Sequence, residues 1–463
     1  MASVELAGRN ALVLGLGVSG LSMARWLDHR GAHVRVADTR AAPPCGAQLR
    51  RELPSVPVVT GTLRPESFQN VDLIAISPGV PTAEPLVETA ARRGVPVMGD
   101  VELFAQALPA FAAAKVLAIT GSNGKSTVTE MTGAMCRRAG LRTIVAGNIG
   151  LPVLDALLAV ERASSPATHQ PEVFVLELSS FQLETTSSLD AHVAACLNLS
   201  EDHLDRYRGM PAYAQAKARI FRGAGIQVLN RQDVWSRSMA LAGRTVFTFG
   251  LDAPSGEREW GLVEEGGDAW LAQSDRKLMS VSRLRVAGLH NAANALAALA
   301  LTRAIDLSYE PLLEALAQFE GLPHRVQKVA EIDGVTFYDD SKGTNVGATL
   351  AAINGMRQKV VLIAGGDGKG QDFSPLKSAV AARARAVILI GRDGDKIARS
   401  IEGSGVPTQR ARTMEEAVRM SLAAARQSDA VLLSPACASF DMFRDYEDRA
   451  RAFVQAVKEL VAK

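Results

Sequence analysis

The sequence predicts an α/β protein of three domains, and three observations support this prediction. The chain has 463 residues, whereas one domain usually has about 100 to 200. Gaps near residues 108–114 and 320–324 separate three groups of short apolar runs. These runs are rich in β-branched residues and alternate with helical patterns, as buried parallel strands do. They lie at residues 11–14, 34–37, 73–76, 116–119, 173–176, 194–197, 360–363, 386–390 and 430–433.

The predicted domains are 1–108, 109–322 and 323–463. We expect a Rossmann-like N-terminal domain, a P-loop ATPase-type central domain and a Rossmann-like C-terminal domain. Residues 244–286 contain short alternating runs at 269–272 and 278–284. This pattern predicts an antiparallel β addition to the central domain.

Composition excludes several classes of protein. The chain carries 51 Lys and Arg against 49 Asp and Glu, a net charge of +2, so no overall field attracts nucleic acid. Four scattered cysteines form no C-x-x-C pair, which argues against a zinc site. No apolar run approaches the roughly 20 residues that span a bilayer, and the first residues lack a signal-peptide pattern. We therefore expect a cytoplasmic monomer that neither enters a membrane nor binds nucleic acid.

The first predicted strand runs into a glycine-rich turn. Gly15, Gly17 and Gly20 follow the strand, and Asp38 ends the next strand 18 residues after Gly20. This spacing matches the dinucleotide fingerprint, in which the turn and helix N-terminus hold a diphosphate and the acid binds a ribose. A tight turn without a ligand and a nicotinamide-dependent oxidoreductase are the alternatives.

A second glycine-rich loop begins the central domain, after the strand at 116–119. Its backbone N–H groups and Lys125 would hold the β- and γ-phosphates of ATP, and the Ser126 hydroxyl would bind Mg²⁺. The loop departs from the standard P-loop pattern because Ile119 stands where its first glycine belongs. The predicted phosphate-binding residues are Gly121, Ser122, Asn123, Gly124, Lys125, Ser126 and Thr127.

Polar side chains also follow the next two strands of this domain. Glu177 comes directly after the run at 173–176 and is predicted to bind a metal, although it could instead cap the following turn. His203 lies in an acidic cluster after the strand at 194–197. Because ligands of α/β sheets bind at the carboxyl ends of strands, a functional role is favoured over a structural one.

The C-terminal domain has charged groups where its strands are predicted to end. Arg325 and Lys369 could neutralise phosphate or a substrate carboxylate, and Asp340 could hold a ribose or a metal. A nucleotide-dependent switch does not need such a domain. A ligase does, since it must hold ATP and an acid in line, exclude water and then admit an amine.

Eight motifs together resemble those of the Mur ligases of bacterial cell-wall synthesis, which are related to folylpolyglutamate synthetase. They are GLGVSG, TGSNGKST, LELSSFQLE, NLSEDHLDRY, GLHNAANALAA, DDSKGTN, GGDGKGQDFSPL and LSPACASFDMF, and they cover nearly the whole chain. Their combination is similar to that of members which add D-glutamate to UDP-N-acetylmuramoyl-L-alanine. A member that adds another amino acid is the alternative.

The resemblance implies roles for residues that the patterns alone do not reveal. Lys217 would carry a carbamate, which converts a cation into an anion able to hold a second Mg²⁺; without the resemblance it looks like a lysine on a helix surface. Lys125, His203, Lys217 and Lys342 would be the catalytic residues. The ATP contacts would add Asn291, Asn294, Arg325 and Asp340 to the loop, and the metal ligands would be Ser126, Glu177, His203 and Lys217.

The two other substrates would bind in the outer domains. The glycine turn is reassigned from a nicotinamide cofactor to the UDP group of the substrate. Its pocket would include Val18, Ser19, Asp38, Thr39, Arg40, Ser77 and Gly79, with Asn148 on the muramoyl side. D-Glutamate would contact Thr344, Lys369, Ser439, Phe440 and Tyr446. Tyr446 stands where the family pattern leads us to expect phenylalanine.

Overall fold

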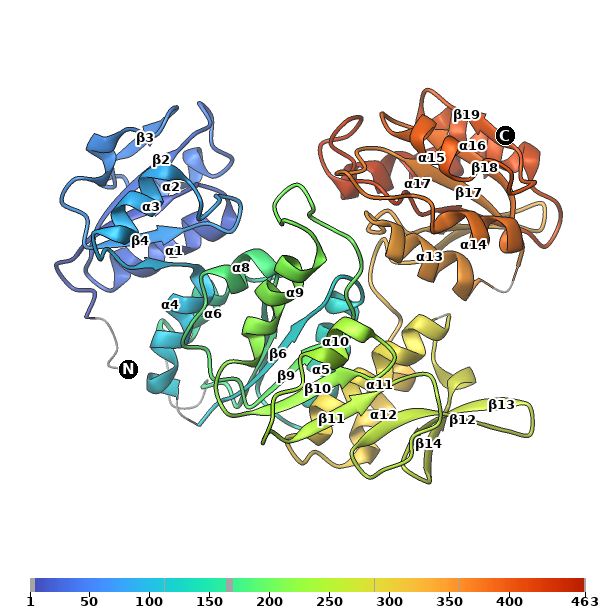
Figure 1. The fold of residues 1–463 in the computed structure, drawn as a ribbon, viewed down its shortest axis with the longest axis horizontal. Helices are drawn as coiled ribbons and strands as arrows, with labels where there is room; N and C mark the ends of the chain where they lie inside the picture. The colour runs from blue at the N-terminus through green and yellow to red at the C-terminus, as the bar shows by residue number, and fades with distance from the viewer. Residues whose placement is uncertain (1–4, 112, 164–169, 287, 357, 462–463) are drawn as a thin grey trace.

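A computed structural model describes residues 5–111, 113–163, 170–286, 288–356 and 358–461. Three sheets, each covered by helices, form three α/β units (Figure 1). The N-terminal and C-terminal units lie at opposite ends of the view, with the central unit below and between them. None of the helices described in these ranges is both long enough and apolar enough to cross a lipid bilayer.

The N-terminal sheet is parallel throughout, with strand order β3-β2-β1-β4-β5. Its first turn requires glycine because a Cβ on Gly20 would lie 1.9 Å from the carbonyl oxygen of Gly15, whose own φ is +84°. The strands are β1 (Asn10–Leu14), β2 (His33–Asp38), β3 (Val58–Thr60), β4 (Leu73–Ile76) and β5 (Val97–Met98). The helices are α1 (Val18–His29), α2 (Gly46–Glu52), α3 (Pro85–Arg92) and α4 (Asp100–Ala107), with a 3₁₀ turn at Pro65–Phe68.

Nine strands form the central sheet, in the order β14-β13-β12-β11-β10-β9-β6-β8-β7. They are β6 (Lys115–Thr120), β7 (Thr143–Gly147), β8 (Val173–Glu177), β9 (Val193–Cys196), β10 (Ile226–Asn230), β11 (Val246–Phe249), β12 (Glu259–Glu265), β13 (Asp268–Gln273) and β14 (Arg276–Ser280). The helices are α5 (Lys125–Arg138), α6 (Val153–Glu161), α8 (Ser180–Glu184), α9 (Met210–Ala218), α10 (Val234–Ser238), α11 (Leu289–Arg303) and α12 (Tyr309–Gln318). Three 3₁₀ turns lie at Leu108–Phe111, Arg219–Phe221 and Val281–Arg283.

The predicted antiparallel addition at 244–286 is only partly correct. β12, β13 and β14 pair antiparallel, and in Figure 1 they project away from the two outer units. β11, however, pairs parallel with both β10 and β12. The helix α10 between β10 and β11 provides the crossover that returns the chain in the same direction. The run at 278–284 also leaves the sheet at Ser280 and continues as the 3₁₀ turn.

The C-terminal sheet has the order β15-β16-β20-β17-β18-β19, and only the edge pair β15–β16 is antiparallel. Its strands are β15 (Gln327–Ile332), β16 (Val335–Asp339), β17 (Val360–Gly365), β18 (Ala384–Ile390), β19 (Thr408–Arg410) and β20 (Ala430–Leu433). The helices are α13 (Val346–Gly355), α14 (Leu376–Arg383), α15 (Gly394–Ser400), α16 (Met414–Ala424) and α17 (Tyr446–Val461).

Apolar packing continues from the N-terminal unit into the central one. Phe104 of α4 packs edge-on against Phe174 of β8, with ring centroids 5.2 Å apart. α4 therefore contributes to the packing of the central unit, although it precedes residue 108. The boundaries at 108 and 322 stay predictions.

Candidate active site

Residues 121–124, which the sequence predicts to bind phosphate and which we call the phosphate loop, join β6 to α5 and are shaped by two glycines. Gly121 has φ +153° and Gly124 has φ +84°, and a Cβ on Gly124 would lie 2.5 Å from Oδ1 of Asn294. Lys125 folds back so that its Nζ donates to the carbonyl oxygens of Gly121 and Ser122, each at 2.9 Å. Burial lowers the pKa of this ammonium. The loop is thus a row of backbone groups with a half-buried cation at its centre.

Glu177 lies beside the loop because β8 pairs with β6, where Ile119 is its register partner. The side chain is only 2% exposed. Its Oε1 accepts a hydrogen bond from Nδ2 of Asn148 at 2.8 Å, whereas its Oε2 is buried without a hydrogen-bond partner in the described structure. A buried carboxylate oxygen without a donor costs free energy unless a cation or another group binds it.

Lys217 lies in the interior, contrary to the helix-surface position that its sequence context suggests. It is 1% exposed, and its Nζ donates to the carbonyl oxygen of Gly121 at 2.8 Å and lies 3.3 Å from Oγ1 of Thr120. Burial and the charge of Lys125 lower its pKa to about 7. Sequence periodicity could not reveal this position, because α9 packs its lysine against a loop nearly a hundred residues earlier.

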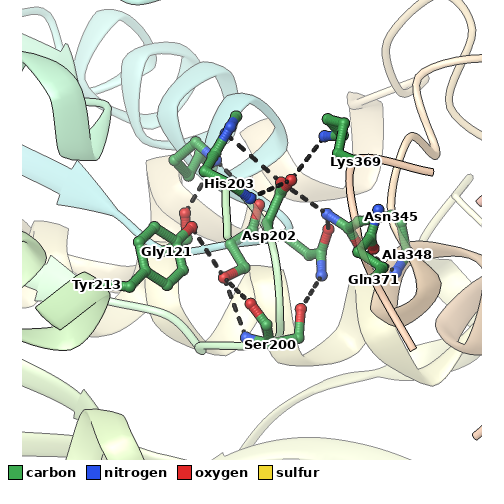
Figure 2. Close-up of polar contacts among 12 residues, drawn as sticks. Gly121, Ser200, Asp202, His203, Tyr213, Asn345, Ala348, Lys369 and Gln371 are labelled. Atoms are coloured by element: carbon green, nitrogen blue, oxygen red, sulfur yellow. Dashed lines mark hydrogen bonds and ion pairs between the residues drawn. The ribbon is translucent and has the colours of Figure 1, made fainter. Parts of the chain in front are cut away.

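His203 and Asp202 follow β9 on the other side of the loop. His203 has φ +56° and packs edge-on against Phe181, with ring centroids 4.7 Å apart. Burial lowers the pKa of His203. Asp202 is 6% exposed, and Nζ of Lys369 lies 2.6 Å from its Oδ1 (Figure 2). The sequence pattern pointed to a role for the histidine but not for Asp202.

The C-terminal unit brings further charged groups to the loop. Arg325 donates from Nη2 to Oγ of Ser126 at 2.7 Å. Asp340 accepts from Oγ of Ser434 at 2.7 Å, and burial raises its pKa to about 7. The ammonium of Lys342 lies 3.6 Å from the centre of the Tyr446 ring, and burial lowers its pKa to about 8.

Most of these groups line a cavity of about 300 Å³ between the central and C-terminal units. Gly121, Lys217, Ser439, Phe440 and Tyr446 are not among its lining residues. Nζ of Lys217 does, however, donate to the carbonyl oxygen of Gly121, which directly precedes the lining residue Ser122. Asn198, Asp202 and Asn345 also line the cavity, although no sequence pattern predicted a role for them. The predicted residues that line it are Ser122, Asn123, Gly124, Lys125, Ser126, Thr127, Asn148, Glu177, His203, Asn291, Asn294, Arg325, Asp340, Lys342, Thr344 and Lys369.

A second cavity, of about 540 Å³, opens at the carboxyl ends of the N-terminal strands. Asp38 is 2% exposed there and accepts hydrogen bonds from the backbone N–H of Leu16 at 2.6 Å and from Nη2 of Arg40 at 2.6 Å. The Arg40 guanidinium holds the Asp38 pKa at about 2. Asn148 lines both cavities. The predicted UDP-binding residues that line this cavity are Val18, Ser19, Asp38, Thr39, Arg40, Ser77 and Gly79.

Three family models match the chain in order. They are described as the Mur ligase MurD-like N-terminal domain at residues 9–99, the Mur ligase middle domain at 119–302 and the Mur ligase glutamate ligase domain at 324–437. Together they match most of each unit and all the residues that line the two cavities.

Curated relatives match over the full length of the chain. The UDP-N-acetylmuramoylalanine--D-glutamate ligase of Thiobacillus denitrificans is 59% identical, over 100% of this chain and 98% of that protein. The enzyme of the same name from Nitrosospira multiformis is 58% identical, over 99% and 97% of the two chains.

Solved structures share the fold at low sequence identity. The UDP-N-acetylmuramate-alanine ligase of Thermotoga maritima has a TM-score of 0.62 at 20% identity and covers 98% of this chain and 100% of its own. MurF from Acinetobacter baumannii has a TM-score of 0.62 at 18% identity, covering 100% of this chain and 93% of its own. With three domain models in sequence and close relatives over its whole length, the chain belongs to the Mur ligase family of ATP-dependent ligases.

Proposed function

We propose that the protein joins the amine of D-glutamate to the carboxylate of UDP-N-acetylmuramoyl-L-alanine, with ATP as the energy source, in the synthesis of peptidoglycan precursors. The observation that carries this proposal is the 59% identity, over the whole chain, to a relative named for this reaction. The matched glutamate ligase domain at 324–437 agrees with it. A monomeric state and a cytoplasmic location stay predictions from the sequence.

The cavity between the central and C-terminal units suits a nucleoside triphosphate. Lys125 would exchange the carbonyl oxygens of Gly121 and Ser122 for phosphate oxygens, which accept more strongly because they are charged. Arg325 is already held beside Ser126, where it would meet the terminal phosphate. The family contacts to the rest of the nucleotide are expected from Asn291, Asn294 and Asp340.

The residues around Glu177 fit a magnesium ion. Its Oε2 is buried without a donor, and carboxylate and hydroxyl oxygens are the ligands that Mg²⁺ prefers. Ser126, Glu177, His203 and carbamylated Lys217 would hold the metal ions. Bound there, Mg²⁺ would neutralise charge on the phosphates and favour transfer of the terminal phosphoryl group.

The environment of Lys217 supports a carbamate. A pKa of about 7 leaves a large neutral fraction at slightly basic pH, and only a neutral amine can attack carbon dioxide. The product is an anion, whose charge would relieve the repulsion between Lys217 and Lys125. It would also place carboxylate-like oxygens near the metal ligands.

The other two substrates would reach this cavity from opposite sides. The UDP group would occupy the N-terminal cavity, with its acceptor carboxylate directed past Asn148, which lines both cavities. D-Glutamate would enter from the C-terminal unit, where Thr344 and Lys369 line the cavity. Ser439, Phe440 and Tyr446 would complete its site when the C-terminal unit moves closer.

The reaction would proceed through an acyl phosphate. The substrate carboxylate attacks the terminal phosphorus of ATP and releases ADP, while Lys125 and Arg325 stabilise the charge on the transferred group. The amine of D-glutamate then attacks the acyl carbon, and phosphate leaves. His203 is a candidate to accept the amine proton because its lowered pKa keeps it neutral near pH 7. A histidine that binds metal cannot take this role at the same time.

Phosphate release measured with a panel of UDP-muramoyl acceptors and amino acids tests the proposal. We expect release only when an acceptor and an amino acid are both present, and the highest kcat/KM with UDP-N-acetylmuramoyl-L-alanine and D-glutamate. Lys125→Ala should abolish turnover while its thermal unfolding stays close to that of the original protein. Replacement of the exposed Lys377 by alanine is the control for loss of a lysine.

Near-normal ligation by Lys125→Ala would overturn the phosphate-binding role. A preference for another amino acid would instead make the protein a different member of the family. Tight binding of NADH, seen by a change in its absorbance or fluorescence, would revive the nicotinamide alternative for the N-terminal cavity.

A further inference from the structure

Two side chains of the C-terminal unit converge on one carboxylate of the central unit. Nζ of Lys369 lies 2.6 Å from Oδ1 of Asp202, and Nδ2 of Asn345 donates to Oδ2 at 3.2 Å (Figure 2). Asp202 is 6% exposed and Asn345 4%. Both contacts cross the boundary between the units, and both lie beside the phosphate loop.

The central unit holds this carboxylate in place by its own chain. The backbone N–H of His203 donates to Oδ1 of Asp202 at 3.0 Å, and Nε2 of His203 lies 3.6 Å from Oδ2. The adjacent left-handed residue, His203, turns the chain sharply after β9. Asp202 is therefore a fixed acceptor and not a mobile surface acid.

On the C-terminal side, each of the two donors is held by a hydrogen bond within its own unit. Asn345 caps α13, since its Oδ1 accepts from the backbone N–H of Ala348 at 2.8 Å, and its Nδ2 also donates to Oδ1 of Asn123 at 3.0 Å. Lys369 has φ +51°, and its backbone N–H is held by Oδ1 of Asp367 at 3.0 Å. A contact at Asp202 thus fixes both the start of α13 and the loop that carries Lys369.

We propose that Asp202 is a positioning residue that places the C-terminal unit over the phosphate loop and directs Lys369 toward the carboxylate of the incoming amino acid. The second half of this inference rests on the proposed function, which assigns Lys369 to D-glutamate. An ammonium has three N–H donors. Asp202 takes one of them, and Lys369 lines the cavity, so the others are available to a second carboxylate.

Loss of the Asp202 charge has an effect that a change in side-chain size alone would not have. In Asp202→Asn the ammonium of Lys369 keeps its partial burial but loses its ion-pair partner, so it is expected to turn toward solvent. Asn345 would meet an amide in place of a carboxylate. Contacts of ATP with the phosphate loop and of UDP with the N-terminal cavity involve other residues and should change little.

Steady-state kinetics with Asp202→Asn tests this directly. We expect the KM for D-glutamate to rise about tenfold or more, while the KM values for ATP and for the UDP substrate change by less than about twofold. The control is Asp205→Asn, the same chemical change three residues later at an exposed position. It should leave all three KM values unchanged.

Small-angle X-ray scattering supplies a readout that needs no activity. Without substrates, Asp202→Asn should have a larger radius of gyration than the original protein and than Asp205→Asn, because two contacts between the units are weakened. An equal rise of all three KM values, or scattering and kinetics like those of Asp205→Asn, would overturn the inference. Failure of the original protein to use D-glutamate would refute the proposed function, yet the scattering comparison would still test the placement of the units.

Discussion

Lys125 and Lys217 donate to the same backbone oxygen, that of Gly121, with N···O distances of 2.9 and 2.8 Å. Lys217 is buried and Lys125 is half-buried, and the neutral oxygens that accept from them cannot compensate two positive charges. The pKa of each is lowered by burial, and that of Lys217 falls to about 7 with Lys125 as the second cause. Lys217 can therefore lose its proton near neutral pH, whereas a bound phosphate would keep Lys125 charged.

The lowered pKa of Lys217 predicts that the stability of the protein depends on pH, and that Lys217→Met removes this dependence. The pKa of Lys217 is lowered from 10.5 to about 7, so between these values the unfolded chain binds one more proton than the folded chain. The free energy of unfolding should therefore rise with pH in this window, by at most about 1.4 kcal/mol per unit. Below pH 7 both states bind the proton and the slope vanishes.

Urea unfolding of the original protein and Lys217→Met, in buffers free of carbon dioxide, measures this slope difference. Lys342 also titrates near pH 8, but it is present in both proteins and cancels in the comparison. Lys377→Met is the control for removal of an exposed lysine and should keep the original slope. Parallel stability curves for the original protein and Lys217→Met would contradict the lowered pKa.

Arg206, in the segment after β9 that also carries His203, contacts a loop that lines the N-terminal cavity. Its Nη2 pairs with Oε2 of Glu184 at 2.5 Å, and its Nη1 donates to the carbonyl oxygen of Pro78 at 3.2 Å. Pro78 lies between Ser77 and Gly79, which line that cavity. Arg206→Lys keeps the charge but loses the planar fork that reaches both partners.

We expect this variant to raise the KM for the UDP substrate about tenfold and to leave the KM for ATP nearly unchanged. The exposed Arg208→Lys makes the same chemical change two residues away and should behave like the original protein. Titration of the UDP substrate by calorimetry would measure the same loss as weaker binding. Equal affinities in the two variants would show that the loop after β4 keeps its shape without Arg206.

Much of the fold could be predicted because the parallel strands are buried on both faces and read as continuous apolar runs. The run at 73–76 coincides with β4, and that at 430–433 with β20. The direction of β11 could not be obtained this way, since periodicity reports burial and not strand orientation. It depends on the short helix α10, whose five residues are too few for a clear helical pattern.

The site residues also differ in how far the sequence alone could place them. Groups close to the end of their own strand, such as Glu177 at the end of β8 and Ser126 at the start of α5, could be placed from the sequence because strand ends meet at one edge of a sheet. Lys217 could not, as its burial depends on how α9 packs against a distant loop. The contacts of Asp202 require the relative placement of two units, which no local pattern encodes.

Arg449 is a buried cation that stabilises the C-terminal unit. It is 1% exposed, and it donates to Oγ of Ser341 at 3.0 Å, to the carbonyl oxygen of Ser341 at 2.7 Å and to that of Cys437 at 3.0 Å. Arg449→Met would leave two buried carbonyl oxygens without these donors. We expect a loss of about 2 to 5 kcal/mol in the free energy of unfolding, measured by urea denaturation.

The matched control is Arg451→Met, on the same helix but half exposed, where the pair with Asp448 at 3.1 Å is a surface contact. Its cost should stay below about 1 kcal/mol. Similar losses for the two variants would mean that the buried hydrogen bonds of Arg449 add nothing beyond those of a surface ion pair.

Gly147 controls the approach of β7 to Glu177, the proposed metal ligand. Its φ is +117°, and a Cβ there would lie 2.2 Å from the backbone oxygen of Glu177. Gly147→Ala should therefore cost about 2 to 5 kcal/mol through strain and overlap. It should also displace Asn148, whose Nδ2 donates to Oε1 of Glu177.

Gly150→Ala is the control, because Gly150 also has a positive φ, +65°, but open space around the position of a Cβ. This variant should lose only about 1 kcal/mol in the free energy of unfolding. Thermal unfolding and phosphate release would measure both effects, and equal losses in the two variants would show that backbone strain alone, without the contact to Glu177, determines the cost.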